Sequence, residues 1–128
     1  MSETPSAPAG RQIIEAYGPG RIRISGTIHQ RPVIILPDAV VDWPLAGIAD
    51  LTLDSLAAVA AVRPPIEILI IGCGLRMAFI RSDLRQALRA SGLVIDAMDT
   101  GAACRTYNVL LAEDRRVAAA LVPLPAQP

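Results

Sequence analysis

Two short loops carry the residues that could do chemistry in this chain. One is the Gly-Cys-Gly loop at 72–74, which follows the apolar run 66–71, and the other is the Asp-Thr-Gly loop at 99–101, which follows the apolar run 93–98. Ligands of open α/β sheets bind beyond the carboxyl ends of the strands, where such loops meet. We therefore expect a binding crevice built from Gly72, Cys73, Gly74, Asp99, Thr100, Gly101, Arg105 and Asn108.

The second loop runs directly into a predicted helix, so one interpretation is an anion site. The first backbone N–H groups of a helix, here those of Gly101, Ala102 and Ala103, have no partner within the helix and lie at the positive end of its dipole. The simpler interpretation is that Asp99 or Thr100 caps the helix with its own side chain.

Arg105 and Asn108 extend this predicted site along the same helix. Arg105 falls almost opposite the apolar stripe, where it could hold an anion or a partner's carboxylate, or simply be solvated. Asn108 lies at the margin of that stripe. The residues predicted to face the sheet are Ala103, Tyr107, Leu110 and Leu111, with the Tyr107 hydroxyl hydrogen-bonded.

Cys73 stands between two glycines at a strand end, a position that a nucleophile can occupy. A reactive thiolate needs an activating base, and the only histidine, His29, lies in the N-terminal strands. A partly buried side chain in a backbone turn is therefore favoured, and Cys104 is predicted to pack in the core. Because the two cysteines and one histidine lack ligand spacing, we expect no metal. We also expect no nucleotide cofactor, because Met77 replaces the third glycine of a GxGxxG pattern.

Four arginines predict a charged surface. Arg81, Arg85 and Arg89 recur every four residues on one face of a predicted helix, and Arg76 lies just upstream. This ridge could meet an acidic partner or anionic lipid head groups. A solvated surface, neutralised by Asp83 and other neighbours, is the alternative.

The elements that must position these residues predict an α/β fold. Three N-terminal strands, at 13–17, 21–24 and 33–36, suggest an antiparallel meander with a bulge or bend at Gly26. After them, helices and strands alternate, which implies parallel strands joined by crossovers. We expect one three-layer domain with a mixed central sheet and the N-terminal hairpin at its edge or as a side layer. The later elements are predicted at 54–62 (helix), 66–71 (strand), 82–90 (helix), 93–98 (strand), from Asp99 or Thr100 (helix) and 116–122 (strand).

Two further details follow from the pattern. Ser82 is a plausible N-cap for the second helix, with Leu84, Ala87 and Leu88 spaced for one buried stripe. Trp43, the only tryptophan, is either a core plug or an exposed anchor, and we favour the plug.

The composition bounds the class of protein. At 128 residues and 52% hydrophobic content, the chain suits one domain with its own core. The 12 basic residues balance 12 acidic ones, and aromatic content is 3%, so we expect no nucleic-acid partner. All the basic residues are arginine, which excludes Schiff-base catalysis by lysine.

The ends of the chain and its cysteines predict a simple organisation. We expect a disordered lead-in at 1–10, a single domain at 11–123 and a flexible tail at 124–128. No apolar run is long enough to span a bilayer, and the N-terminus lacks the pattern of a signal peptide. Together with cysteines that lack a pairing pattern, this predicts a cytoplasmic protein.

The segment MDTGAACRTYNVLLAEDRRVAAAL at 98–121, preceded by IEILIIGCG and DLRQALRASG, closely resembles the Mth938-like family. The match runs from about residue 13 to residue 123. The resemblance implies a three-layer α/β fold with a mixed sheet. It carries over no catalytic residues, because none are assigned for the family. Relatives often carry a hydroxyl residue where this chain has Cys73, which puts a shared chemical role for that position in doubt.

The family includes a mitochondrial assembly factor for respiratory complex I, and this implies a non-catalytic protein that binds another protein. The partner would be a respiratory-complex subunit or a component of membrane-protein biogenesis, and the location the cytoplasm, at the inner membrane face. The alternative is a small-molecule or anion binder, or a weak enzyme, that uses the crevice at Gly72–Gly74 and Asp99–Ala102. A third reading, thiol chemistry, requires a fast-reacting Cys73. The sequence leaves the oligomeric state open.

Overall fold

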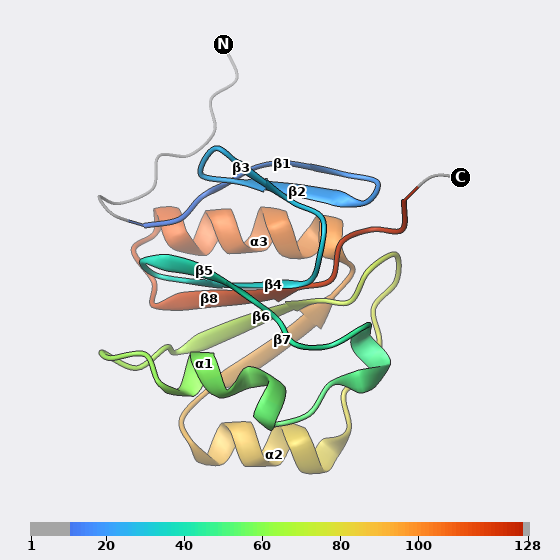
Figure 1. Cartoon of the computed structure of the whole chain (residues 1–128). Coiled ribbons are helices and arrows are strands. Elements are labelled where there is room, and N and C mark those ends of the chain that lie inside the picture. Colours follow the sequence, from blue (N-terminus) through green and yellow to red (C-terminus); the bar gives the residue numbers. More distant parts are fainter. Residues whose placement is uncertain (1–10, 127–128) are drawn as a thin grey trace.

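The computed structural model describes residues 11–126, whose elements form four layers (Figure 1). A three-stranded sheet lies over helix α3 (Thr100–Ala112), and α3 lies over a five-stranded sheet. Helices α1 (Ala57–Ala60) and α2 (Ser82–Ala90) cover the opposite face of that sheet. The predicted α/β class with a mixed sheet is confirmed, and the N-terminal strands form a side layer.

The five-stranded sheet has the strand order β5-β4-β8-β6-β7. Its last three strands are parallel to one another, β4 is antiparallel to its neighbour β8, and β5 is antiparallel to β4. Every residue of β8 is buried because helices cover both faces of the sheet at its centre. The bounds are β4 Val33–Leu36, β5 Ala39–Asp42, β6 Ile68–Gly72, β7 Val94–Met98 and β8 Val117–Leu121.

The predicted N-terminal meander is wrong in its third strand. The side layer contains β1 (Ile14–Gly18), β2 (Arg21–Ile24) and β3 (Thr27–His29), whereas the apolar run 33–36 is β4 of the central sheet. The predicted bend at residue 26 is a tight reversal, in which Ser25 and Gly26 have φ values of 45° and 88°. Because all four residues of β4 are buried, that strand needs cover on both faces, which the central sheet supplies.

The helices on the open side are shorter than the sequence predicts. The helix expected at 54–62 is a 3-10 turn, Asp54–Leu56, followed by the four residues of α1. A second 3-10 turn, Ile48–Asp50, precedes it. The bounds of α2 agree with the prediction.

Two predicted details of α2 are wrong. Ser82 is the first helical residue and Arg81 takes the N-cap position without a side-chain hydrogen bond. Leu84 and Leu88 are buried as expected, but Ala87 is exposed, because short α1 leaves that side of α2 uncovered. Among residues 11–126, no helix combines the length and apolar character required to cross a bilayer.

Two clusters of apolar side chains form the core, one on each face of the central sheet. Trp43 belongs to the cluster under α1 and α2, so the predicted core plug is confirmed. The other cluster joins β1, β2, α3 and the opposite face of the central sheet, and it includes Tyr107 and Cys104, both predicted to be buried. Helix α3 therefore packs against two sheets at once.

Polar contacts fasten the side layer to α3. The Asn108 side-chain amide accepts a hydrogen bond from the Ile14 N–H at 3.1 Å and donates to the Ile14 carbonyl at 2.7 Å. The Tyr107 hydroxyl donates to the Gln12 carbonyl at 2.8 Å. The predicted lead-in, 1–10, lies outside the described residues. In the predicted tail, the Leu124 carbonyl accepts from the Gly20 N–H at 2.8 Å, which adds a contact to the side layer.

Replacing Asn108 by Ala should loosen β1. The substitution removes two hydrogen bonds and leaves both backbone groups of Ile14 without these partners, which costs about 1–3 kcal/mol of unfolding free energy. Urea denaturation measures the loss, and amide hydrogen exchange at Ile14 should accelerate. The control is Val109→Ala, an exposed position on the same helix. Equal stability of the two variants would contradict this role of Asn108.

Candidate functional site

The loops at 72–74 and 99–101 lie together in the structure and are hydrogen-bonded to each other. The Thr100 N–H donates to the Gly74 carbonyl, and the Gly74 N–H donates to Thr100 Oγ1, both at 2.8 Å. The same hydroxyl donates to the Val122 carbonyl at 2.5 Å. Thr100 is fully buried. The predicted meeting of the two loops thus consists of direct contacts that join β6, α3 and the segment after β8.

Gly72 has no room for a side chain. A Cβ atom there would lie 2.8 Å from Cδ2 of Leu121, 3.1 Å from Oγ1 of Thr100 and 3.2 Å from Cβ of Ala103. These neighbours are themselves buried. The glycine therefore permits α3 to approach the end of β6, which is a packing requirement and does not need a ligand to explain it.

The start of α3 is capped by its own chain. The Asp99 carboxylate accepts a hydrogen bond from the Ala102 N–H at 3.0 Å, and the Asp99 carbonyl accepts from the Ala103 N–H at 2.9 Å. The capping interpretation is therefore confirmed for Asp99. Of the first four amides of the helix, only that of Gly101 has no hydrogen-bond partner within residues 11–126.

Arg105 and Asn108 hold the side layer on α3. Arg105 is exposed, as predicted, and its guanidinium donates a hydrogen bond to the Tyr17 hydroxyl of β1. The Tyr17 ring and hydroxyl lie 3.2 Å from the position that a Cβ would take at Gly101, so they cover that side of the helix start. Asn108 is occupied by its two bonds to Ile14.

Neither cysteine has the surroundings of a catalytic thiol. Cys73 and Cys104 are both buried and free. Burial raises the pKa of Cys73, and the nearby Asp99 carboxylate acts in the same direction while backbone groups of Ala78 and Met98 oppose it. Burial likewise raises the pKa of Cys104 to about 12. His29 lies on β3 in the other sheet, paired with Ile22.

Only part of the predicted arginine ridge is free to meet a partner. Arg81 pairs with Asp83 at 3.4 Å, and both side chains are exposed. Arg85 is half-buried and donates to the Ile95 carbonyl at 3.3 Å. Arg76 and Arg89 are exposed and form no ion pair within the described residues. Only the two ends of the ridge, Arg76 and Arg89, are therefore available to a partner, whereas Arg85 contacts the Ile95 carbonyl.

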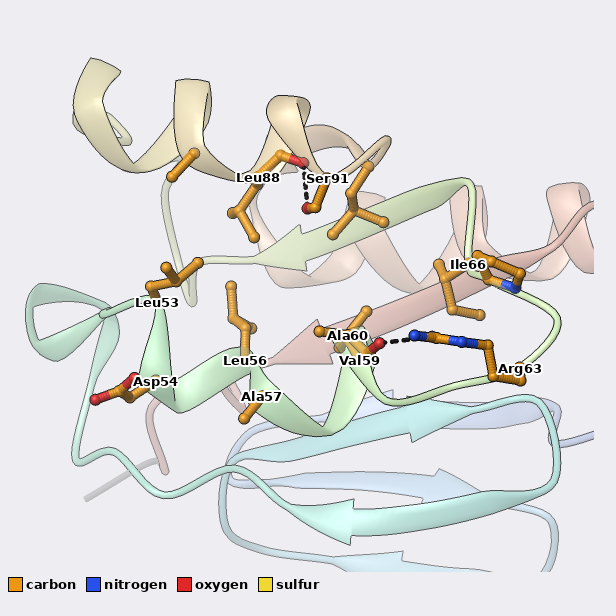
Figure 2. Close-up of a pocket in the computed structure, with 13 residues that line it drawn as sticks. Leu53, Asp54, Leu56, Ala57, Val59, Ala60, Arg63, Ile66, Leu88 and Ser91 are labelled. Carbon is orange, nitrogen blue, oxygen red and sulfur yellow. Dashed lines mark hydrogen bonds between the residues drawn. The ribbon is translucent and has the colours of Figure 1, made fainter.

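An apolar groove of about 530 Å³ lies between α1 and α2, on the face of the central sheet that is opposite α3 (Figure 1 and Figure 2). Its floor is made by the buried side chains of Leu56, Val59, Ile66, Leu88 and Leu93. The side chains along its edges are small and include the exposed alanines Ala57, Ala60 and Ala87. This volume is within the range of sites that bind small molecules or a partner's side chains.

Two charged residues lie at opposite ends of the groove, as Figure 2 shows: Asp54 at one end and Arg63 at the other. One guanidinium nitrogen of Arg63 donates to the carbonyls of Ala60 and Val62 at 2.9 and 2.8 Å. That leaves the other N–H groups of Arg63 available at the rim. No cluster of three or more His, Cys, Asp or Glu side chains suited to a metal occurs in the part of the chain that the structure describes.

No pattern in the sequence predicted this groove. It arises because α1 is only four residues long and rich in alanine, so that helix cannot cover the sheet and reach α2. The alanine run was visible in the sequence, but it predicted a longer helix. The spacing between two helices is a tertiary property that no local pattern carries.

The chain is similar in sequence and in structure to several known proteins. A sequence model of a family described as a protein of unknown function (DUF498/DUF598) matches residues 14–122. The chain is 38% identical over 117 residues to an uncharacterised protein of Rhodobacter capsulatus, covering 91% of this chain and 89% of that protein. It is 33% identical over 114 residues to NADH dehydrogenase (ubiquinone) 1 alpha subcomplex assembly factor 3 of Danio rerio, covering 89% of this chain and 66% of that relative, just under two thirds.

The fold is similar to a solved Mth938-like domain from Bordetella pertussis. The two chains superpose with a TM-score of 0.80 at 31% identity, over 99% of this chain and 95% of the other. The resemblance drawn from the sequence is therefore confirmed.

Replacing Gly72 by Ala should destabilise the fold. The added methyl group enters a space bounded by Leu121, Thr100 and Ala103, so we expect a loss of about 1–3 kcal/mol in unfolding free energy. Chemical denaturation measures the change. Gly47→Ala is the matched control, because no atom lies within 4 Å of its Cβ position, and its change should stay within about 0.5 kcal/mol. A neutral Gly72→Ala variant would show that α3 does not depend on this contact.

Both thiols should resist alkylation in the folded protein. At pH 8 iodoacetamide should modify Cys73 and Cys104 slowly in buffer and rapidly in urea, because burial disfavours both thiolates. Mass spectrometry of the labelled peptides separates the two sites. Rapid labelling of Cys73 in the folded protein would instead support thiol chemistry.

The burial of Cys104 also makes the stability of the fold depend on pH. Burial raises the pKa of the Cys104 thiol from 9.0 to about 12, so its contribution to stability is complete below pH 9 and is lost as the pH rises toward 12. In the Cys104→Ala variant, the unfolding free energy should fall less steeply with rising pH.

Proposed function

This chain belongs to the family of proteins described as DUF498/DUF598, with Mth938-like structural relatives, and from this we propose that it is a non-catalytic accessory protein of membrane-complex assembly. It acts by binding another protein, a subunit of a respiratory NADH dehydrogenase or a component of its biogenesis. Support comes from the relative of Danio rerio whose name is that of an NADH dehydrogenase assembly factor. The aligned region is only part of that relative, so its whole activity is not transferred.

The observation that carries the proposal is the apolar groove between α1 and α2. A substrate site usually places several polar groups where the reaction occurs, whereas the middle of this groove is aliphatic. An apolar stripe of a partner helix is the kind of surface that such a groove accepts. The exposed alanines at its edges let a helix approach closely.

The charges at the two ends of the groove favour one orientation of a bound helix. The N-terminus of a helix carries partial positive charge and its C-terminus partial negative charge. Asp54 would therefore face the N-terminal end of the partner helix, and Arg63 the C-terminal end or a carboxylate near it. Arg63 is held for this by its bonds to Ala60 and Val62.

The alternative function, an anion or small-molecule site at Gly72–Gly74 and Asp99–Ala102, has weaker support. A ligand there could use the Gly101 amide, since the amides of Thr100, Ala102 and Ala103 already have partners. The Asp99 carboxylate beside that amide would repel an anion, and Tyr17 lies over it. Stabilisation of the fold by an anionic metabolite, lost in Arg105→Ala, would favour this alternative.

Charges introduced into the groove should abolish partner binding. The variant Ala60→Glu/Ala87→Glu places carboxylates among the lining side chains at exposed positions, so the fold should tolerate it. Affinity capture with cross-linking and mass spectrometry, from a strain lacking the native gene, should recover NADH dehydrogenase subunits with the unmodified protein and at least about tenfold less with the variant. Native gels should show the same loss in assembled complex.

The matched control is Ala61→Glu/Ala90→Glu, which adds the same charges to exposed positions of the same helical segments outside the groove lining. It should retain capture and assembly. Two results would contradict the proposal: equal capture by the groove and control variants, or normal assembly of the complex in the deletion strain.

A further inference from the structure

The loop between β6 and α2 exposes three large apolar side chains within five residues. Leu75 is 66% exposed, Met77 65% and Phe79 87%, and they alternate along the loop. Most other large apolar side chains of the described residues are in the core. A cluster of this kind at one tip of a molecule marks an interaction surface.

Fixed contacts at both ends of the loop hold it in place. At its start, Gly74 exchanges two hydrogen bonds with Thr100. At its end, Ile80 is buried against the core cluster under α1 and α2. The half-buried Ala78 packs against the same cluster. The three exposed side chains are therefore presented from a braced loop, and their exposure is not the fraying of a chain end.

The loop and the helix after it carry more arginines than carboxylates, and the half-buried Asp99 lies near Cys73 at the start of the loop. Arg76 lies within the loop, Arg81 follows it, and Arg85 and Arg89 continue along α2. The only acidic residue between positions 74 and 90 is Asp83, which pairs with Arg81. On the adjoining element, Asp50 is exposed beside Ile48 and Ala49, which share a small hollow with Phe79. The loop and the helix after it thus carry four arginines and one carboxylate.

We propose that this loop, 75–79, inserts into the head-group region of an anionic lipid bilayer. Leu, Met and Phe side chains would enter the boundary between head groups and acyl chains, while Arg76 and Arg89 would pair with lipid phosphates. The insertion is shallow, because an irregular loop has backbone N–H and C=O groups that the hydrocarbon core cannot satisfy. This inference is independent of the partner proposed for the groove.

The size and charge of the patch favour a lipid surface over a second protein. Three side chains of this size expose on the order of 400 Å² together, whereas a stable protein interface buries about 800 Å² on each partner. A bilayer needs no complementary shape, and its anionic phosphates match the excess of arginine. Peripheral binding of this kind combines a small apolar insertion with electrostatic attraction.

Co-sedimentation of the full chain with vesicles tests the proposal. Vesicles of phosphatidylcholine with about 30% phosphatidylglycerol should bind the protein, and phosphatidylcholine alone should bind it at least about tenfold more weakly. Met77→Ser/Phe79→Ser should reduce binding to the anionic vesicles by about tenfold or more. The matched control is Ile28→Ser/Val94→Ser, whose side chains are 55% and 57% exposed elsewhere on the molecule. It should bind like the unmodified chain.

Two more variants separate the electrostatic and apolar contributions. Arg76→Gln/Arg89→Gln should weaken the preference for anionic vesicles without changing stability, since neither arginine forms an ion pair within residues 11–126. Arg85 is left intact because it bonds to Ile95. The tryptophan fluorescence of Phe79→Trp should shift to shorter wavelength on anionic vesicles, whereas that of Val94→Trp should not.

Three results would overturn the proposal. The first is that the unmodified chain does not sediment with anionic vesicles. The second is that the Met77→Ser/Phe79→Ser variant binds them as well as the Ile28→Ser/Val94→Ser control does. The third is that the loop variant loses capture of a protein partner while no vesicle binds the chain, which would make the loop part of a protein interface.

Discussion

The close approach of α3 to the end of β6 is the constraint on which the rest of the structure depends. Gly72 leaves space for Thr100, and the buried Thr100 hydroxyl then bonds to Gly74 and to the carbonyl after β8. A single side chain thereby joins one strand end, one helix start and the chain beyond another strand. Because all of these groups are buried, each needs a partner within the protein, and the arrangement supplies one.

Helix α3 is the element that joins the two sheets. Its residues serve two sheets: Ala103 and Leu111 pack in the core, while Tyr107, Asn108 and Arg105 reach the N-terminal strands. A helix between two layers has few positions that are free to vary, because a change on either face removes packing or a hydrogen bond. The residues that the sequence offered as a site are thus mainly the ones that assemble the layers.

The two surfaces proposed for binding are not formed by α3 itself. The groove between α1 and α2 exists because the four-residue α1 does not fill the space beside α2. The loop after β6 has exposed apolar side chains because its ends are fixed by Gly74 and Ile80, while Leu75, Met77 and Phe79 between them remain largely exposed. The first surface is concave and aliphatic and the second is convex and basic, so they suit different partners.

By itself, the sequence determined the α/β class, the bounds of α2, the start of α3 at Asp99 or Thr100 and the burial of Trp43, Cys104 and Tyr107. These follow from hydrophobic spacing, capping residues and turn residues, whose effects extend over only a few positions. The tertiary structure decided that residues 33–36 join the central sheet, that the expected crevice is bridged by Thr100, and that a groove opens beside short α1. The physical reason is the distance in sequence between partners: Asn108 binds Ile14 across 94 positions, and such a contact is chosen by the packing of whole layers. No local pattern could identify it.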